Sequence, residues 1–137
     1  IFRNDFLAWL SGLGTTIGVQ SSSVSTSLIV PLAGAGAVRL RRVYPYLLGC
    51  NIGTTVTGVL AASASPTAGA VTVAIVHVLF NVFGNVVWYP LRMFPIRMAK
   101  WLSSLAARNP RHAFIFLATV FLVIPIIGLI ITELFLF

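Results

Sequence analysis

Three long stretches of the chain carry no charged side chain, and short basic segments separate them. They cover residues 6–38, residues 43–91 with His77 counted as neutral, and residues 113–132. A membrane-spanning helix needs about 20 mostly apolar residues. The second stretch is therefore long enough for two spans, and the third for one.

We predict these spans at residues 43–64, 70–91 and 112–137. A turn is expected between the first two near Pro66, which a Ser-Pro-Thr-Ala-Gly sequence surrounds. Pro125 is a candidate kink in the last span, because proline interrupts the hydrogen bonds of a helix.

The first stretch, residues 6–38, differs from the others because its middle is polar. Six hydroxyl residues and a glutamine fall within eight positions, residues 20–27. Each apolar arm has about 11–14 residues, too few to cross a bilayer. Two short arms around a polar tip predict a re-entrant helical hairpin, whose tip must be covered by protein or water.

The composition excludes an ordinary soluble domain. Charged residues make up 8% of the chain and hydrophobic residues 58%, whereas a soluble domain is roughly 25% charged. Nine residues are Lys or Arg, and the net charge is +7. In a soluble domain this excess would suggest nucleic-acid binding, but in a membrane protein it indicates cytoplasmic loops.

The basic residues also restrict the topology. A hairpin returns the chain to its starting side, so Arg3, the cluster at residues 39–42 and a basic loop at 92–111 all lie on the cytoplasmic side. A single span at residues 6–38 would place Arg3 on the opposite side, although two complete crossings would fit equally well. Within the loop, residues 96–108 can form the basic amphipathic helix of an interfacial connector.

The polar tip is the first candidate for chemistry. A helix beginning after Gln20 would point its free N–H groups and the positive end of its dipole into the membrane, which favours an anion. Ser21, Ser22 and Ser23 add hydroxyl donors and a helix cap. The oxygens of Gln20 and the serines also suit a hard cation such as Na⁺. Hydrogen bonding between helices is the alternative, but this density of hydroxyl groups favours a binding function.

A second polar interruption, residues 49–58, falls near the middle of the next predicted span. Its glycines weaken a helix, and Asn51 is a good N-cap for a half-helix that begins at Ile52. We therefore predict a broken helix of the kind that forms substrate and ion sites in secondary transporters. The alternative is a packing face of small residues, because Gly53 and Thr57 are four residues apart.

His77, Asn81 and Asn85 form a polar stripe along one face of a helix. Hydrogen bonding between helices is favoured for this stripe over proton relay by His77. No acidic or basic residue lies at the centre of a predicted span, so we find no acid–base pair, no His/Cys metal cluster and no acidic partner for a serine hydrolase. Neutral oxygen ligands favour Na⁺ as the coupling ion, with no cofactor or other metal.

Several motifs occur in the order and spacing of a known family. They are Gln-Ser-Ser-Ser at 20–23, Asn-Ile-Gly-Thr-Thr at 51–55, the segment 77–81, Trp-Tyr-Pro at 88–90 and Pro-Ile-Arg-Met-Ala-Lys at 95–100. This set covers nearly the whole chain and resembles the type II sodium-dependent phosphate cotransporter family. The resemblance implies two inverted repeats around one central site, of which this chain is the second repeat.

The resemblance also implies roles for individual residues. Phosphate would be bound by Ser21, Ser22, Ser23 and Asn51. Sodium ligands would come from Gln20, Ser21, Asn51, Thr54 and Thr55. Cys50 stands where the family often has serine, and a thiol is a poor ligand for a hard cation.

We thus expect an all-α integral membrane protein with one re-entrant hairpin and three transmembrane helices, the first of them broken. It would be one half of an inverted-repeat transporter in a plasma or bacterial inner membrane. The expected function is sodium-coupled symport of inorganic phosphate, not catalysis, together with a complementary repeat in the same longer chain or a second subunit. Transport of another small anion, and a non-transporting scaffold or regulatory subunit, remain the alternatives.

Overall fold

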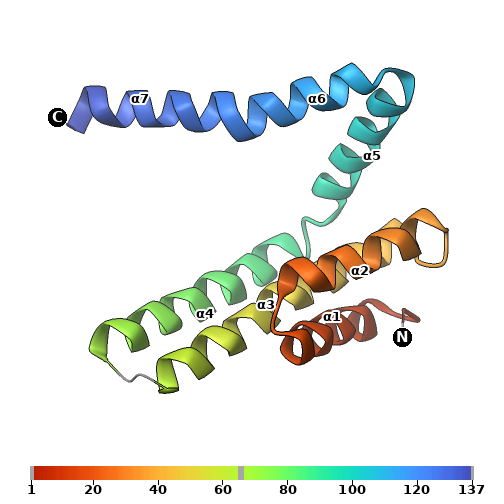
Figure 1. Cartoon of the computed structure of the whole chain (residues 1–137). Helices are drawn as coiled ribbons and strands as arrows, with labels where there is room; N and C mark the ends of the chain where they lie inside the picture. The colour runs from red at the N-terminus through yellow and green to blue at the C-terminus, as the bar shows by residue number, and fades with distance from the viewer. Residues whose placement is uncertain (1, 65–66, 137) are drawn as a thin grey trace. The chain divides into compact units, whose positions relative to one another are not determined.

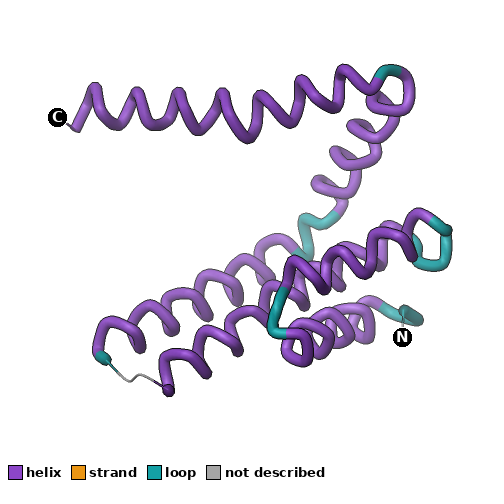
Figure 2. Tube along the Cα trace, in the orientation of Figure 1, coloured by secondary structure: helices purple, strands orange, loops and turns teal. Residues whose placement is uncertain are grey.

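In the computed structural model, residues 2–64 and 67–136 are described, and all regular structure in them is helical (Figures 1 and 2). The helices are α1 (Asp5–Val19), α2 (Ser22–Gly34), α3 (Leu40–Ala64), α4 (Ala68–Trp88), α5 (Met93–Arg108), α6 (Pro110–Ala118), the π-helix η1 (Thr119–Val123) and α7 (Ile124–Leu136). They divide into two compact units, Ile1–Ile96 and Arg97–Phe137.

Three segments are long and apolar enough to cross a membrane: Leu40–Ala64, Ala68–Trp88 and Pro110–Leu134. They match the three predicted spans to within a few residues, so the prediction of an all-helical chain with three candidate membrane spans is confirmed. Pro66, where a turn was predicted, lies outside the described residues.

The first stretch forms two short helices around a polar turn. α1 has 15 residues and α2 has 13, fewer than the roughly 20 that a span needs. Gln20 ends α1 in the left-handed region with φ 55°, and its N–H donates to the carbonyl of Thr16 at 2.7 Å. α2 then turns back, so that Ile29 packs in a core with Val43 and Tyr46 of α3 (Figure 1).

The predicted break in the next span is wrong, because α3 is one continuous α-helix of 25 residues. Asn51 lies inside it and caps no half-helix. The hydroxyls of Thr54 and Thr55 donate to the carbonyls of Cys50 at 3.1 Å and Ile52 at 2.7 Å, so both are accommodated within the helix. Tertiary packing of the glycines has overridden their weak helix propensity.

That packing is a close contact between α1 and α3, which run parallel. A Cβ at Gly12 or at Gly49 would collide with a backbone carbonyl of the other helix, and a Cβ at Gly53 would lie 2.6 Å from the Cβ of Thr16. Small residues allow helix backbones to approach closely, and this contact replaces the hydrophobic effect as a source of association in lipid. The small-residue packing alternative is therefore the correct interpretation of Gly53.

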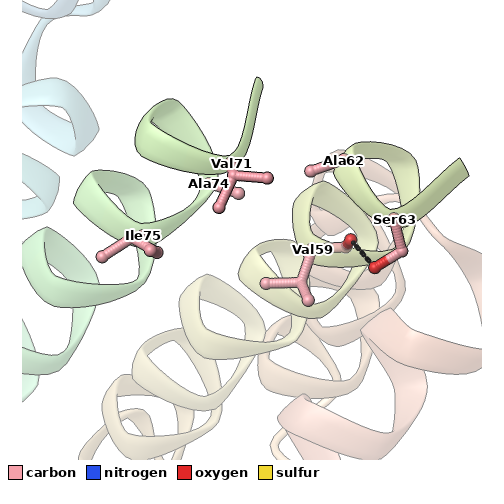
Figure 3. A pocket seen from close by; sticks show the side chains of 6 residues that line it. All are labelled: Val59, Ala62, Ser63, Val71, Ala74 and Ile75. Atoms are coloured by element: carbon pink, nitrogen blue, oxygen red, sulfur yellow. Dashed lines mark hydrogen bonds between the residues drawn. The ribbon is translucent and has the colours of Figure 1, made fainter. Parts of the chain in front are cut away.

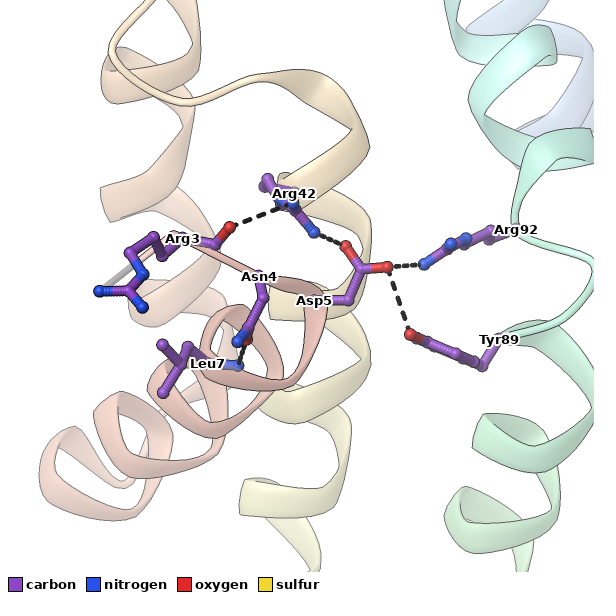
Figure 4. A network of polar contacts seen from close by, with 7 residues as sticks. All are labelled: Arg3, Asn4, Asp5, Leu7, Arg42, Tyr89 and Arg92. Carbon is purple, nitrogen blue, oxygen red and sulfur yellow. Dashed lines mark hydrogen bonds and ion pairs between the residues drawn. The ribbon is translucent and has the colours of Figure 1, made fainter.

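A single carboxylate joins the start of α1 to α3 and to the segment after α4 (Figure 4). Asp5 forms ion pairs with Arg42 and Arg92 and accepts a hydrogen bond from the Tyr89 hydroxyl at 3.3 Å. Arg92 also lies over the Tyr89 ring, 4.8 Å from its centroid. We call these four residues the Asp5 cluster. Arg42 further donates to the carbonyl of Arg3 at 3.2 Å, so these basic segments share one end of the unit, as the charge pattern predicted.

Opposing effects act on the pKa of Asp5. Burial raises it, while the hydrogen bonds and positive charges of Arg92 and Arg42 lower it, and the net result is a lowered pKa. The hydrogen bond from Arg92 to Asp5 correspondingly raises the pKa of Arg92. The cluster therefore stabilises the ionised carboxylate.

Near their connected ends, α3 and α4 line a small open cavity of about 230 Å³ (Figure 3). Its lining residues are Val59, Ala62, Ser63, Val71, Ala74 and Ile75. The hydroxyl of Ser63 donates to the carbonyl of Val59 at 2.8 Å. The cavity therefore presents an apolar wall, and we assign it no ligand.

In the second unit, α6, η1 and α7 follow one another directly as a helical run. The π-helical turn at Thr119–Val123 ends two residues before Pro125. Proline has no N–H to bond the carbonyl four residues earlier, and a π turn is a known way of accommodating such an interruption. The helix predicted within the basic loop is present as α5.

We expect Gly49→Val to destabilise the chain by at least about 2 kcal/mol, because its Cβ meets the carbonyl of Trp9. Gly18→Ala is the matched control, since nothing lies within 4 Å of a Cβ there and alanine favours a helix. Loss of helical circular dichroism on heating in detergent measures both. Equal melting temperatures for the two variants would contradict the packing.

We expect Asp5→Asn to lower the free energy of unfolding by about 1–3 kcal/mol near neutral pH, because two charged hydrogen-bond partners lose their acceptor charge. The pKa of Asp5 is lowered on folding, so this stabilisation is present above the unfolded pKa of about 3.9 and is lost as pH falls through the folded value. Urea unfolding in detergent at neutral pH and at about pH 3 measures the difference. Arg92→Gln, which removes one of the two ion pairs of Asp5, is expected to lower the free energy of unfolding as well. Arg97→Gln, which breaks no described ion pair, is its control, and equal effects of these two variants would oppose the assignment.

Candidate functional site

The serine tip is the N-terminus of α2, and the helix starts where the sequence predicted. Ser21 is the N-cap, and its Oγ accepts a hydrogen bond from the N–H of Val24 at 3.3 Å. Among residues 2–64 and 67–136, the N–H groups of Ser22 and Ser23 have no acceptor. Two backbone donors are thus free at the positive end of the α2 dipole.

Ser25 attaches this helix start to α3. It is fully buried, its hydroxyl donates to the carbonyl of Ser21 at 2.9 Å, and its own carbonyl accepts from the Tyr46 hydroxyl at 2.9 Å. Ser23 and Ser27 are exposed. The hydroxyl residues of the tip therefore divide into a set that packs α2 on α3 and a set that is open.

One side of α3 is polar and open. Asn51, Thr54 and Gly58 share that side because they are three and four residues apart. Asn51 is exposed and Thr54 is half-buried. A Cβ at Gly58 would lie 3.4 Å from the Nδ1 of His77, so His77 of α4 borders the same side. We call this surface the polar side of α3.

The register between α1 and α3 sets the level of the tip along α3. Thr16 lies against Gly53, and four residues farther along the two parallel helices are Gln20 and Thr57. The serine tip is therefore level with Thr57, and His77 is at the same level. One level of the first unit therefore contains the free N–H groups of Ser22 and Ser23, the Gly58 end of the polar side of α3, and His77.

The expected ligands do not form one closed site in this chain. Among the described residues, no hydrogen bond joins the serine tip to Asn51, Thr54 or Thr55. Thr55 is only 4% exposed and Cys50 only 1%. The thiol of Cys50 therefore does not contribute to the polar side of α3.

Within the polar stripe of α4, Asn85 makes interhelical hydrogen bonds. Its Oδ1 accepts from the indole N–H of Trp9 at 2.9 Å, and its Nδ2 donates to the carbonyls of Leu48 at 3.3 Å and Asn81 at 2.9 Å. Asn81 donates to the carbonyl of His77 at 3.0 Å. Asn85 thus has the bridging role expected of the stripe, tying α4 to both α1 and α3.

Three structural contributors received no role from the sequence: Asp5, Trp9 and Tyr46. A buried Trp or Tyr needs a partner for its N–H or O–H, which signals that each makes a hydrogen bond but not with which residue. Asp5 is the sole carboxylate of the first 96 residues, which was the available signal for its importance.

Comparison with known proteins identifies a matching family and similar proteins. The family model described as Na⁺/Pi-cotransporter matches residues 1–128. The chain is 44% identical over 126 residues to sodium-dependent phosphate transport protein 2B of Bos taurus, an alignment covering 88% of this chain and 18% of that protein. It is 46% identical over 126 residues to sodium-dependent phosphate transport protein 2C of Rattus norvegicus, covering 88% of this chain and 21% of that protein.

No solved structure matches the chain. The chain spans about a fifth of the length of the curated relatives it matches. The serine-tipped helix pair and the first two apolar spans fall within the residues that the family model matches, and the third span, Pro110–Leu134, does so up to residue 128. The chain therefore belongs to the Na⁺/Pi-cotransporter family.

Proposed function

We propose that this chain supplies half of the binding site of a transporter that carries inorganic phosphate together with sodium. The observation that carries the proposal is the start of α2, where the N–H groups of Ser22 and Ser23 are free beside the hydroxyl of Ser21. Family membership supports phosphate as the anion and sodium as the coupled ion.

In this proposal, phosphate oxygens accept hydrogen bonds from the two free N–H groups, from the hydroxyls of Ser21, Ser22 and Ser23, and from the amide of Asn51. These donors are neutral, and a helix dipole supplies only about half of a positive charge. A doubly charged phosphate thus remains poorly compensated at membrane depth. Sodium ions complete the compensation, which explains why transport of the anion requires them.

We propose that sodium is held by neutral oxygens of Gln20, Ser21, Asn51, Thr54 and Thr55. Hard cations prefer such oxygen ligands. The hydroxyl of Thr54 donates within α3, which leaves lone pairs on this half-buried oxygen to face a cation, whereas the buried Thr55 would have to be reached from inside the helix packing. His77 and Asn81 would line the access path, while Asn85 fixes the position of α4.

A complementary repeat is needed to close the site. Asn51 is exposed on a helix long and apolar enough to span a membrane, and a polar amide facing lipid is unfavourable. We infer that α1 and α2 form a re-entrant hairpin, that the inverted repeat covers the polar side of α3, and that the arginine-rich end is cytoplasmic.

Phosphate uptake into proteoliposomes tests the proposal, with this chain and its complementary repeat together and with or without an inward sodium gradient. We expect uptake to require sodium, and Ser21→Ala combined with Ser22→Ala to lower kcat/KM by about 10-fold or more, because the cap and two hydroxyl donors are lost. Ser27→Ala, an exposed serine of the same helix, is the control. Uptake that ignores sodium, or a double variant that matches the control, would refute the mechanism.

The same assay separates the alternatives. Competition by sulfate as strong as competition by unlabelled phosphate would indicate another anion on this scaffold. A scaffold without transport predicts that phosphate plus sodium leaves the melting temperature unchanged and that a bulky residue at Ser22 is tolerated.

A further inference from the structure

A polar cavity lies at the opposite end of the first unit from the level of the serine tip. It has a volume of about 320 Å³ and is lined by Asp5, Arg39, Arg41 and Arg42. Arg39 immediately precedes α3, which starts at Leu40. The cavity therefore combines three guanidinium groups with the N-terminus of a helix of 25 residues.

Its positive charge is not compensated within the first unit. Both oxygens of the Asp5 carboxylate are already engaged: Oδ1 by Arg42, and Oδ2 by Arg92 and Tyr89. The other acidic residue of the chain is Glu133, which belongs to the second unit. Among the described residues of the first unit, Arg39 and Arg41 thus have no carboxylate partner, and both are exposed.

An apolar groove meets this cavity at Asp5, which lines both. The groove has a volume of about 480 Å³ and is lined by Asp5, Phe6, Trp9, Asn85, Val86 and Tyr89. It follows α1 and α4 away from the charged end, and Phe6 and Val86 are 66% and 65% exposed. A cationic cavity that continues into an apolar groove is suited to a ligand with an anionic head and a hydrocarbon tail.

The location favours the same class of ligand. The arginines stand where an apolar span begins, and Trp88 and Tyr89 end the neighbouring span at the same end of the unit. Aromatic and basic residues are enriched at the level of the lipid headgroups. Anionic lipids are concentrated in the cytoplasmic leaflet, which attracts basic clusters next to a span.

We propose that the cavity of Arg39, Arg41 and Arg42 binds the phosphate group of an anionic phospholipid, with one acyl chain along the groove at Phe6 and Trp9. Guanidinium groups bind phosphate oxygens through paired N–H donors, and the first N–H groups of α3 add to them. This site is separate from the proposed transport site, and it rests on the proposed function only for the cytoplasmic position of the arginine-rich end.

Native mass spectrometry of the delipidated protein, with its complementary repeat, tests the proposal. Phosphatidylglycerol and phosphatidylcholine with the same acyl chains are added separately, and retained lipid is counted. We expect about fivefold or greater preference for phosphatidylglycerol, and loss of that preference in Arg39→Gln combined with Arg41→Gln. Both substitutions leave the ion pairs of Asp5 in place.

Arg97→Gln combined with Lys100→Gln is the matched control, since it removes two positive charges from the second unit. An equal loss of lipid in this control would reduce the effect to general attraction and overturn the site. Displacement of the lipid by millimolar inorganic phosphate would assign the cavity to the free anion and overturn the lipid proposal.

A charge-preserving pair covers the case in which the glutamine variant does not fold. Arg39→Lys combined with Arg41→Lys keeps both charges but loses the paired donors of guanidinium. We expect it to retain less phosphatidylglycerol than the unmodified protein, and undiminished retention would count against a built phosphate site.

Discussion

The close backbone contact between α1 and α3 is the constraint on which the rest of the first unit depends. Lipid gives two apolar helices little reason to associate, so contact must come from packing and hydrogen bonds. Gly12, Gly49 and Gly53 supply it by removing side chains where the two backbones meet. The register that they set then determines where the serine tip lies along α3.

Electrostatics secures the same arrangement from the other end. Asp5 forms ion pairs with both Arg42 and Arg92, which are 50 residues apart in the sequence. About one helical turn farther along α1, Trp9 adds a hydrogen bond to Asn85 of α4. Charge is thus confined to one end of the unit, while its deeper part uses neutral amides and hydroxyls. A proposed site of neutral donors fits this division, because an anion held by arginine would be harder to release.

Much of the fold follows from hydrophobic length and charge placement alone. The three apolar spans, the two short helices and the shared end of Arg3, Arg42 and Arg92 were all predictable, because lipid imposes simple rules on length and polarity. The N-cap at Ser21 was also predictable, since the preference of serine for the N-cap position depends only on local sequence.

The continuity of α3 could not be predicted from the sequence, because a glycine can either interrupt a helix or allow another helix to pack closely against it. Only the position of α1 decides between them. Tyr46 and Trp9 were missed for a related reason: their partners, Ser25 and Asn85, are distant in sequence. Local propensity indicates what a residue can do, whereas the fold selects which of these it does.

Two contacts fix the position of α1 along its neighbours, so the length of this helix determines where the serine tip lies. Asp5 holds its start, and the contact of Thr16 with Gly53 holds it near its end, only four residues before Gln20. One residue added between these points would advance the tip by about 1.5 Å along α3 and rotate the free N–H groups by roughly 100° about the axis of α1. The length of α1 is therefore as much a part of the site as the serines that it carries.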